Sequence, residues 1–208
     1  DAKLPDGTMA TPIAWIWART VKSTDPSWSE HVPLVRSWVL AKKPGEPIVW
    51  IDPIVDRNSR KISYVIREGG TPPLGNVNRN GATCIATGAS IPFTHIREEG
   101  RAGRHGVTLM AIICESENGR RYVSPSINDF VEVKHQKPDL GAITKNPRDF
   151  KTPNYGMLNW EDLFTQRQSL ALTTFSEILK DVRKHIESDA SNLPVDSIQL
   201  RNGGTGST

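Results

Sequence analysis

One stretch of the chain combines basic side chains with glycines at short spacing, Arg97-Glu-Glu-Gly-Arg-Ala-Gly-Arg-His-Gly106. Glycine has no Cβ, so backbone N–H groups in such a stretch can approach a phosphate closely. Four side chains can donate to the same anion: Arg97, Arg101, Arg104 and His105. The pattern predicts a loop that contacts a nucleic-acid backbone. The alternative is a solvated hairpin connection without a specific partner.

The distribution of charge matters more than its sum, because a net charge of +3 is too small to indicate a nucleic-acid partner. Residues 60–123 hold nine Lys or Arg against five acidic residues, and the basic stretch lies among them. The two cysteines, Cys84 and Cys114, cannot form a disulfide framework. They are expected to be reduced thiols, and the simplest role for each is that of a small buried hydrophobe.

The composition is that of an ordinary globular protein, with 37% hydrophobic and 24% charged residues in 208. The sequence contains neither a run of eighteen apolar residues nor a secretory signal. We therefore expect a cytoplasmic protein with no membrane partner. The five histidines are scattered, and no Ser/His/Asp group, Cys/His pair or nucleophile elbow supports a hydrolase.

Strands dominate the first 150 residues. Residues 61–67 alternate apolar and polar side chains, which predicts a strand with one buried face. Residues 13–17 are apolar on both faces, which predicts a central strand. Short turns punctuate the six expected strands, so the pattern favours an antiparallel meander. The six ranges are 13–20, 33–42, 47–55, 61–68, 107–115 and 120–124.

The pattern becomes helical after residue 150. Thr165-Gln-Arg-Gln168 has the form of a capping box. Apolar residues then recur at helical spacing, at Ala171, Phe175, Ile178, Val182 and Ile186. They predict one amphipathic helix of about twenty residues whose apolar stripe packs in a core. Residues 189–208 are polar and predict a flexible tail.

Four segments together resemble one family, the large adenine-specific DNA methyltransferases that carry a zinc-ribbon insert. The segments are Ile13-Ala-Trp-Ile-Trp-Ala-Arg-Thr-Val-Lys22, Val32-Pro-Leu-Val-Arg-Ser-Trp38, Gly81-Ala-Thr-Cys84 and the string 162–176. The resemblance covers about residues 12 to 185. It implies an α+β fold, in which an antiparallel meander with degenerate zinc-ribbon-like hairpins is followed by a long amphipathic helix.

The resemblance also implies that most of the zinc ligands have been lost. The family's two cysteine pairs would fall at Ser23 and Trp28 and at Cys84 and Thr87, so only one thiolate position is kept. His31 is the only other plausible donor near the first pair. Structural zinc needs four ligands, so we expect no bound metal and expect Trp28 to fill the vacated space.

The motifs for catalysis are absent from this sequence. The family needs a Gly-rich cofactor turn and an (Asp/Asn)-Pro-Pro-(Tyr/Phe) loop. The nearest strings, Asp52-Pro-Ile-Val55 and Asn146-Pro-Arg-Asp149, lack the second proline and the aromatic residue, and are better explained as turns. The chain is therefore expected to be the middle of such an enzyme and inactive alone. Whether it is a fragment or a stand-alone relic stays open.

The resemblance divides the chain into a β-rich ribbon-like insert (residues 1–150), a helical segment that packs on a methyltransferase core (151–188) and the tail (189–208). It implies DNA and the rest of the methyltransferase as partners. S-adenosylmethionine is implied for the full-length family, and a role in restriction-modification or phage defence is only suggested. A stand-alone, non-catalytic module that binds nucleic acid or protein is the alternative.

Overall fold

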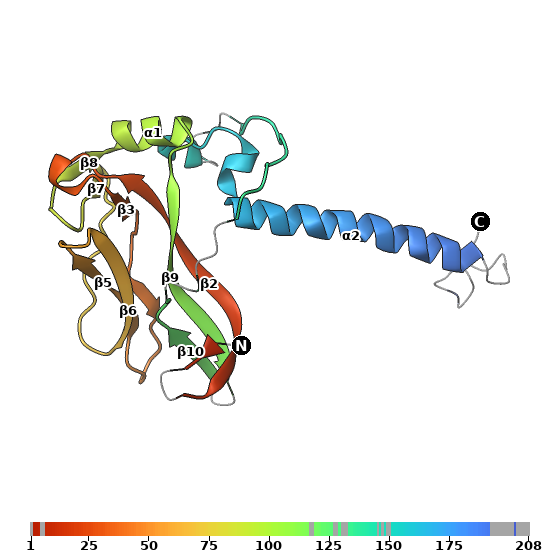
Figure 1. Cartoon of the computed structure of the whole chain (residues 1–208), viewed down its shortest axis with the longest axis horizontal. Coiled ribbons are helices and arrows are strands. Elements are labelled where there is room, and N and C mark those ends of the chain that lie inside the picture. The colour runs from red at the N-terminus through yellow and green to blue at the C-terminus, as the bar shows by residue number, and fades with distance from the viewer. Residues whose placement is uncertain are drawn as a thin grey trace. The chain divides into compact units, whose positions relative to one another are not determined.

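The fold is α+β, with antiparallel sheets followed by a C-terminal helix (Figure 1), as the sequence predicted. The structure is a computed structural model that describes residues 2–4, 7–116, 119–126, 129, 133–144, 146, 148, 151–191 and 202. It divides into two compact units, Asp1–Glu132 with Leu140–Leu163, and Val133–Asp139 with Phe164–Thr208.

The first unit holds all the described strands and the second holds the long helix. The strands are β1 (Ala2–Lys3), β2 (Met9–Lys22), β3 (His31–Pro33), β4 (Val39–Ala41), β5 (Val49–Asp56), β6 (Lys61–Glu68), β7 (Gly81–Thr83), β8 (Ser90–Pro92), β9 (Gly106–Ser116) and β10 (Gly119–Val123). The helices are α1 (Phe93–Arg101), α2 (Gln166–Ser191) and the short 3-10 helices η1 (Pro26–Trp28), η3 (Thr152–Tyr155) and η4 (Trp160–Leu163).

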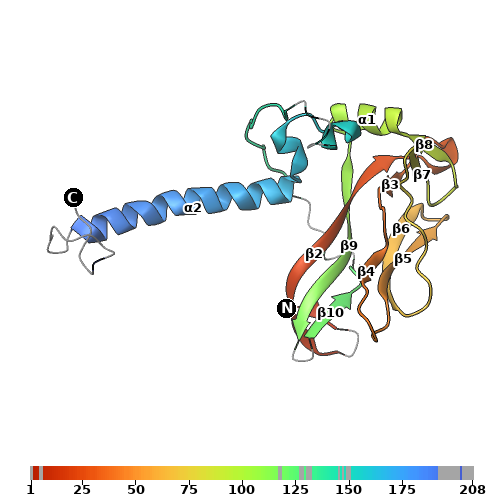
Figure 2. The ribbon, with the colours of Figure 1, turned by 180° about the vertical axis from the view of Figure 1, so that it is seen from behind.

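The central element of the first unit is the antiparallel strand pair of β2 and β9, which run side by side in Figures 1 and 2. Strand order in this sheet is β1-β2-β9-β10, and β3 also pairs with β2. β2 is central, as predicted, but its two apolar faces are not both buried. Ile13 and Trp15 are 44% and 50% exposed, so one face of the strand is open over these residues.

Only part of the strand pattern is a meander. β4, β5 and β6 are consecutive neighbours in a second sheet, whereas β2 pairs with a strand about ninety residues further along the chain. The predicted alternation in β6 is confirmed, because Tyr64 is buried and Ile62 and Ile66 pack against the same core. That core joins the second sheet to the first, with Trp38 and Met110 among its buried members.

The first half of the basic stretch, through Arg101, is helical rather than a loop, which corrects the sequence prediction for that half. Residues Phe93–Arg101 form α1, which follows the hairpin of β7 and β8 directly (Figure 1). Ile96 is fully buried and anchors the helix to the core beneath it. Glycine at position 100 is required by a close approach, because a Cβ there would lie 2.2 Å from the carbonyl oxygen of Tyr155.

The predicted capping box opens α2. The Thr165 N–H donates to Gln168 Oε1 at 2.9 Å, and the Gln168 N–H donates to Thr165 Oγ1 at 3.2 Å. The helix itself is confirmed and reaches Ser191. Of the predicted tail, residues 189–191 are helical, and most of the rest lies outside the described residues.

The apolar stripe of α2, which was predicted to pack in a core, is exposed in the described structure. Phe175 is 67% exposed, Leu179 68% and Ile186 62%. The periodicity predicted the helix correctly, but the apolar side chains on that face of the helix are exposed in the described structure. No helix in the described part of the chain is long and apolar enough to cross a membrane.

Candidate functional site

Two hairpin loops meet at one end of the first unit. The first follows β2 and runs from Ser23 to Glu30, and the second joins β7 to β8. Thr24 Oγ1 in the first loop donates to the Ser90 carbonyl at 2.9 Å. His95 of α1 donates from Nε2 to the Lys22 carbonyl, also at 2.9 Å. These bonds hold the two loops and the start of α1 together.

Cys84 lies at this meeting point with its side chain almost fully buried, at 1% exposure. Burial raises the pKa of its thiol, but hydrogen bonds from the Ser23 and Thr87 hydroxyls and from the Ala86 and Thr87 N–H groups outweigh that effect. The pKa of Cys84 is therefore lower than usual. Ser23 and Thr87, two of the positions that the resemblance aligns with zinc ligands, thus both contact Cys84, which is a third.

Trp28, the fourth position, is buried at 2% exposure in the same core cluster as Cys84. Its indole Nε1–H has no hydrogen-bond partner in the described structure, so it serves as apolar filling rather than as a polar contact. His31 instead shares a 2.9 Å hydrogen bond between its Nδ1 and Thr20 Oγ1. Among the described residues, no group of three or more His, Cys, Asp or Glu side chains could hold a metal ion.

Two of the four predicted DNA-binding side chains are engaged within the protein. Arg104 forms a forked ion pair with Glu99, with Nη2 to Oε1 at 2.6 Å and Nε to Oε2 at 3.1 Å. Hydrogen bonds from Arg104 lower the pKa of the Glu99 carboxyl despite partial burial. His105 donates from Nε2 to the Ile96 carbonyl at 2.9 Å, and burial lowers its pKa, which favours the neutral ring at pH 7.

The other two predicted side chains can still bind an anion. The Arg101 side chain is exposed and makes no hydrogen bond or ion pair among the described residues. Arg97 uses Nε to donate to the Asn154 carbonyl at 3.2 Å, which leaves its terminal nitrogens for another acceptor. That bond also ties α1 to η3, so the structure places this basic end of α1 beside residues 152–155.

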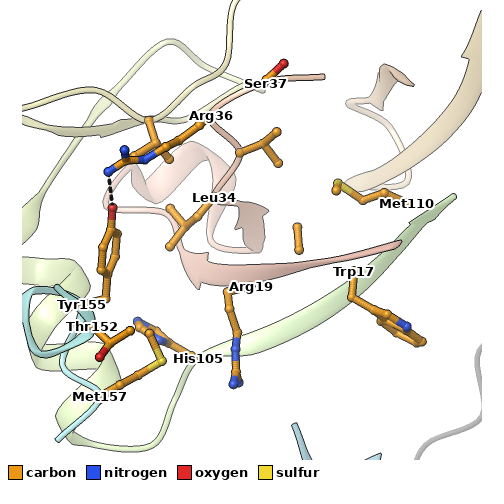
Figure 3. Close-up of a pocket in the computed structure, with 13 residues that line it drawn as sticks. Trp17, Arg19, Leu34, Arg36, Ser37, His105, Met110, Thr152, Tyr155 and Met157 are labelled. Atoms are coloured by element: carbon orange, nitrogen blue, oxygen red, sulfur yellow. Dashed lines mark hydrogen bonds between the residues drawn. The ribbon is translucent and has the colours of Figure 1, made fainter. Parts of the chain in front are cut away.

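A groove of about 490 Å³ lies next to this junction and was not predicted (Figure 3). Arg36, Tyr155 and His105 line it near one end, and Met110 and Trp17 lie away from them in Figure 3. Arg36 Nη2 donates to the Tyr155 hydroxyl at 2.9 Å. The Tyr155 ring is fixed in turn by an edge-on contact with Phe93, with ring centres 5.5 Å apart.

Arg19 adds a second guanidinium to the lining of the groove. Its Nη2 donates to the backbone carbonyls of Asp162 at 2.9 Å and Leu163 at 3.3 Å, the last residues of η4. Burial lowers the pKa of Arg19, and the negative charge of Asp162 partly offsets this effect. No local pattern in the sequence indicates this site, because Tyr155 lies 119 residues from Arg36 in the chain and meets it only after folding.

No protein-family model, curated protein or solved structure matches the chain. Any functional assignment therefore depends on the residues and geometry of this chain.

Proposed function

We propose that the chain is the central, DNA-contacting region of an adenine-specific DNA methyltransferase, with a ribbon held by packing in place of zinc. One observation carries the proposal. The positions that the resemblance aligns with the two cysteine pairs come from loops about sixty residues apart, and they meet at Cys84. A chance resemblance limited to short strings gives no reason for those particular positions to converge.

The proposed DNA contact is made by α1. Arg97 and Arg101 lie one helical turn apart and retain nitrogens that can donate to phosphate oxygens. Arg104 is less suited to this role, because it already neutralises Glu99. The proposed DNA-binding set therefore consists of Arg97 and Arg101, with Arg104 and His105 as supporting residues of the same segment.

The remaining parts of the enzyme would be supplied by other segments. S-adenosylmethionine binding and methyl transfer need motifs that this sequence does not contain. The exposed stripe of α2 fits a helix that packs on a methyltransferase core, since burying a side chain such as Phe175 contributes about 1.5–3 kcal/mol. A role of the complete protein in restriction-modification or phage defence is part of the same proposal.

The same exposed stripe favours the alternative, a stand-alone, non-catalytic module that binds another protein. The two functions differ in their dependence on DNA. A protein-binding module needs no affinity for duplex DNA, whereas the methyltransferase region does.

The test is the salt dependence of duplex DNA binding, measured by fluorescence anisotropy for the unaltered chain and for Arg97→Ala/Arg101→Ala. Each lost phosphate contact changes the slope of log K against log salt by about 0.9, so the double variant should lose about 1.8. Lys42→Ala/Arg120→Ala is the matched control, because it removes two exposed charges from β4–β5 and β10. Undetectable binding at low salt, or equal slopes in both variants, would refute the proposed DNA contact.

A further inference from the structure

We infer that the apolar stripe of α2 is covered by α2 of a second copy of this chain, in a short antiparallel coiled coil. The proposed function has this helix pack on a methyltransferase core. The inference deepens that function and rests on it, because it names a second copy as the part of the core that the stripe contacts. Two copies of the DNA-contacting region would then belong to one enzyme.

The spacing of apolar side chains in α2 indicates the kind of surface that they fit. Five of them recur at alternating intervals of three and four residues, which is the a/d pattern of a heptad repeat. In a coiled coil each such side chain inserts between four residues of a facing helix. The pattern therefore favours a helix as the partner. The five seam residues are Leu172, Phe175, Leu179, Val182 and Ile186.

The exposed apolar area is sufficient for a dimer of modest affinity. Every seam residue is at least 44% exposed, and Ile178, which flanks the seam at a g position, is 50% exposed. At about 100 Å² of apolar area for each of these side chains, two copies would bury about 1,200 Å² together. Specific protein–protein interfaces begin at about this size. We therefore expect a dissociation constant in the micromolar range.

The residues beside the seam do not repel a second copy. Among the e and g positions of residues 171–190, Arg183 is the single Lys, Arg, Asp or Glu. It pairs with Glu187 of its own helix at 2.7 Å, and Lys184 pairs with Asp181 at 3.2 Å. Like charges at e and g positions determine which coiled-coil partners are excluded. Two identical α2 helices therefore meet without like charges across the interface.

Asp189 distinguishes the two possible directions of the helix pair. It occupies the d position that follows Ile186 in the repeat. In a parallel pair the two Asp189 carboxylates would face each other in one layer of the seam, where like charges destabilise the pair. In an antiparallel pair centred between Leu179 and Val182, each Asp189 lies opposite Leu172 of the partner subunit, at the end of the seam. The two carboxylates are then about 25 Å apart.

The test is sedimentation equilibrium of the full chain over about 1–300 µM, a range that brackets the expected dissociation constant. We expect a monomer–dimer equilibrium. Phe175→Gln/Leu179→Gln removes two seam side chains and should raise the dissociation constant at least about tenfold. Glu177→Gln/Lys184→Gln is the matched control, because it changes two exposed f positions on the opposite face and leaves the net charge unchanged. It should stay within about twofold of the unaltered chain.

A second variant separates loss of pairing from loss of the helix. Asp189→Leu extends the seam by one apolar layer and should lower the dissociation constant at least about threefold, which a variant with a damaged helix cannot do. Direction is measured with pyrene attached at Ala190→Cys, since Cys84 and Cys114 are buried. The two labels are about 28 Å apart in an antiparallel pair, so no excimer emission is expected.

Four results would overturn the inference: a monomer at every concentration, equal dissociation constants for the seam and control variants, no tightening by Asp189→Leu, or strong excimer emission. A persistent monomer would show that the stripe is covered by another protein. The duplex salt slope of the unaltered chain distinguishes this failure from that of the proposed function. A monomer that keeps the slope loses only the second copy, whereas a dimer without duplex binding loses the proposed DNA contact and keeps the helix pair.

Discussion

If the proposed family assignment is correct, cysteines placed at the three non-cysteine ligand positions should turn the buried loop junction into a zinc site. The variant Ser23→Cys/Trp28→Cys/Thr87→Cys, together with the native Cys84, places four cysteines at the positions that meet between the two hairpin loops. Four thiolates at tetrahedral spacing form a closed structural zinc site. We expect the variant to bind one zinc ion per chain, although the native chain has a tryptophan in that space.

The magnitude follows from what each substitution removes. Trp28 is 2% exposed, and truncating a buried tryptophan costs about 3–5 kcal/mol. Replacing the Ser23 and Thr87 hydroxyls removes two hydrogen bonds to Cys84, each contributing about 1 kcal/mol. The metal-free variant should therefore be destabilised by about 5–7 kcal/mol. Free zinc at a thousand times its dissociation constant would return about 4 kcal/mol of this.

The assay is thermal unfolding of the triple variant with zinc and with chelator, beside cobalt(II) absorption spectra that report tetrahedral thiolate ligation. Trp28→Cys alone is the control, because it opens the same cavity and offers only two thiols. The reasoning is refuted if the triple variant binds no more metal than the single one, or if chelator leaves its melting temperature unchanged. Either result would show that the four positions do not form a ligand set and would remove the main support for the resemblance.

Two further predictions concern the rest of the chain. Phe175→Gln/Leu179→Gln should leave the free energy of unfolding of the first unit within about 0.5 kcal/mol of its native value, since both side chains are more than 60% exposed. The measurement is denaturant unfolding, and a larger loss would show that the stripe has a partner within the chain. The pKa of Glu99 is lowered in the folded state, so its ion pair with Arg104 stabilises the fold at pH values above the unfolded pKa of Glu99. This stabilisation is lost as the pH falls through the folded pKa. Glu99→Gln should therefore make the free energy of unfolding depend less on pH on the acid side, and an unchanged pH profile would contradict the assigned pairing.

The features that the sequence predicted correctly are those fixed by neighbouring residues. Thr165 and Gln168 form their capping box within four residues, and β6 shows its buried face by simple alternation. The pairing of β2 with β9 joins strands about ninety residues apart, and no local pattern encodes it. The glycine-spaced segment illustrates the same limit, because α1 depends on Ile96 and on the close approach of Gly100 to Tyr155. Both of those contacts are made only after folding.

The stripe of α2 shows a different limit of periodicity. The spacing of apolar residues establishes that a helix is amphipathic. It does not say whether the surface that buries the apolar face belongs to the same chain. Here α2 begins with its own capping box, so its first turn is stabilised by neighbouring residues. The apolar side chains along the helix are exposed in the described structure.

A loop junction held by packing in place of a metal, as the proposed function requires, unfolds differently from a zinc ribbon. A zinc ribbon couples its folding to metal binding, so chelation or thiol oxidation can unfold it. Here Trp28, Val32 and Ile91 pack in the same core cluster as Cys84, and the Cys84 thiol is buried, so a mild oxidant has little access to it. The pKa of Cys84 is nevertheless lowered by donors that would stabilise a thiolate. Those donors contribute nothing to apolar packing, and their presence is expected if the loops once held a metal-bound sulfur.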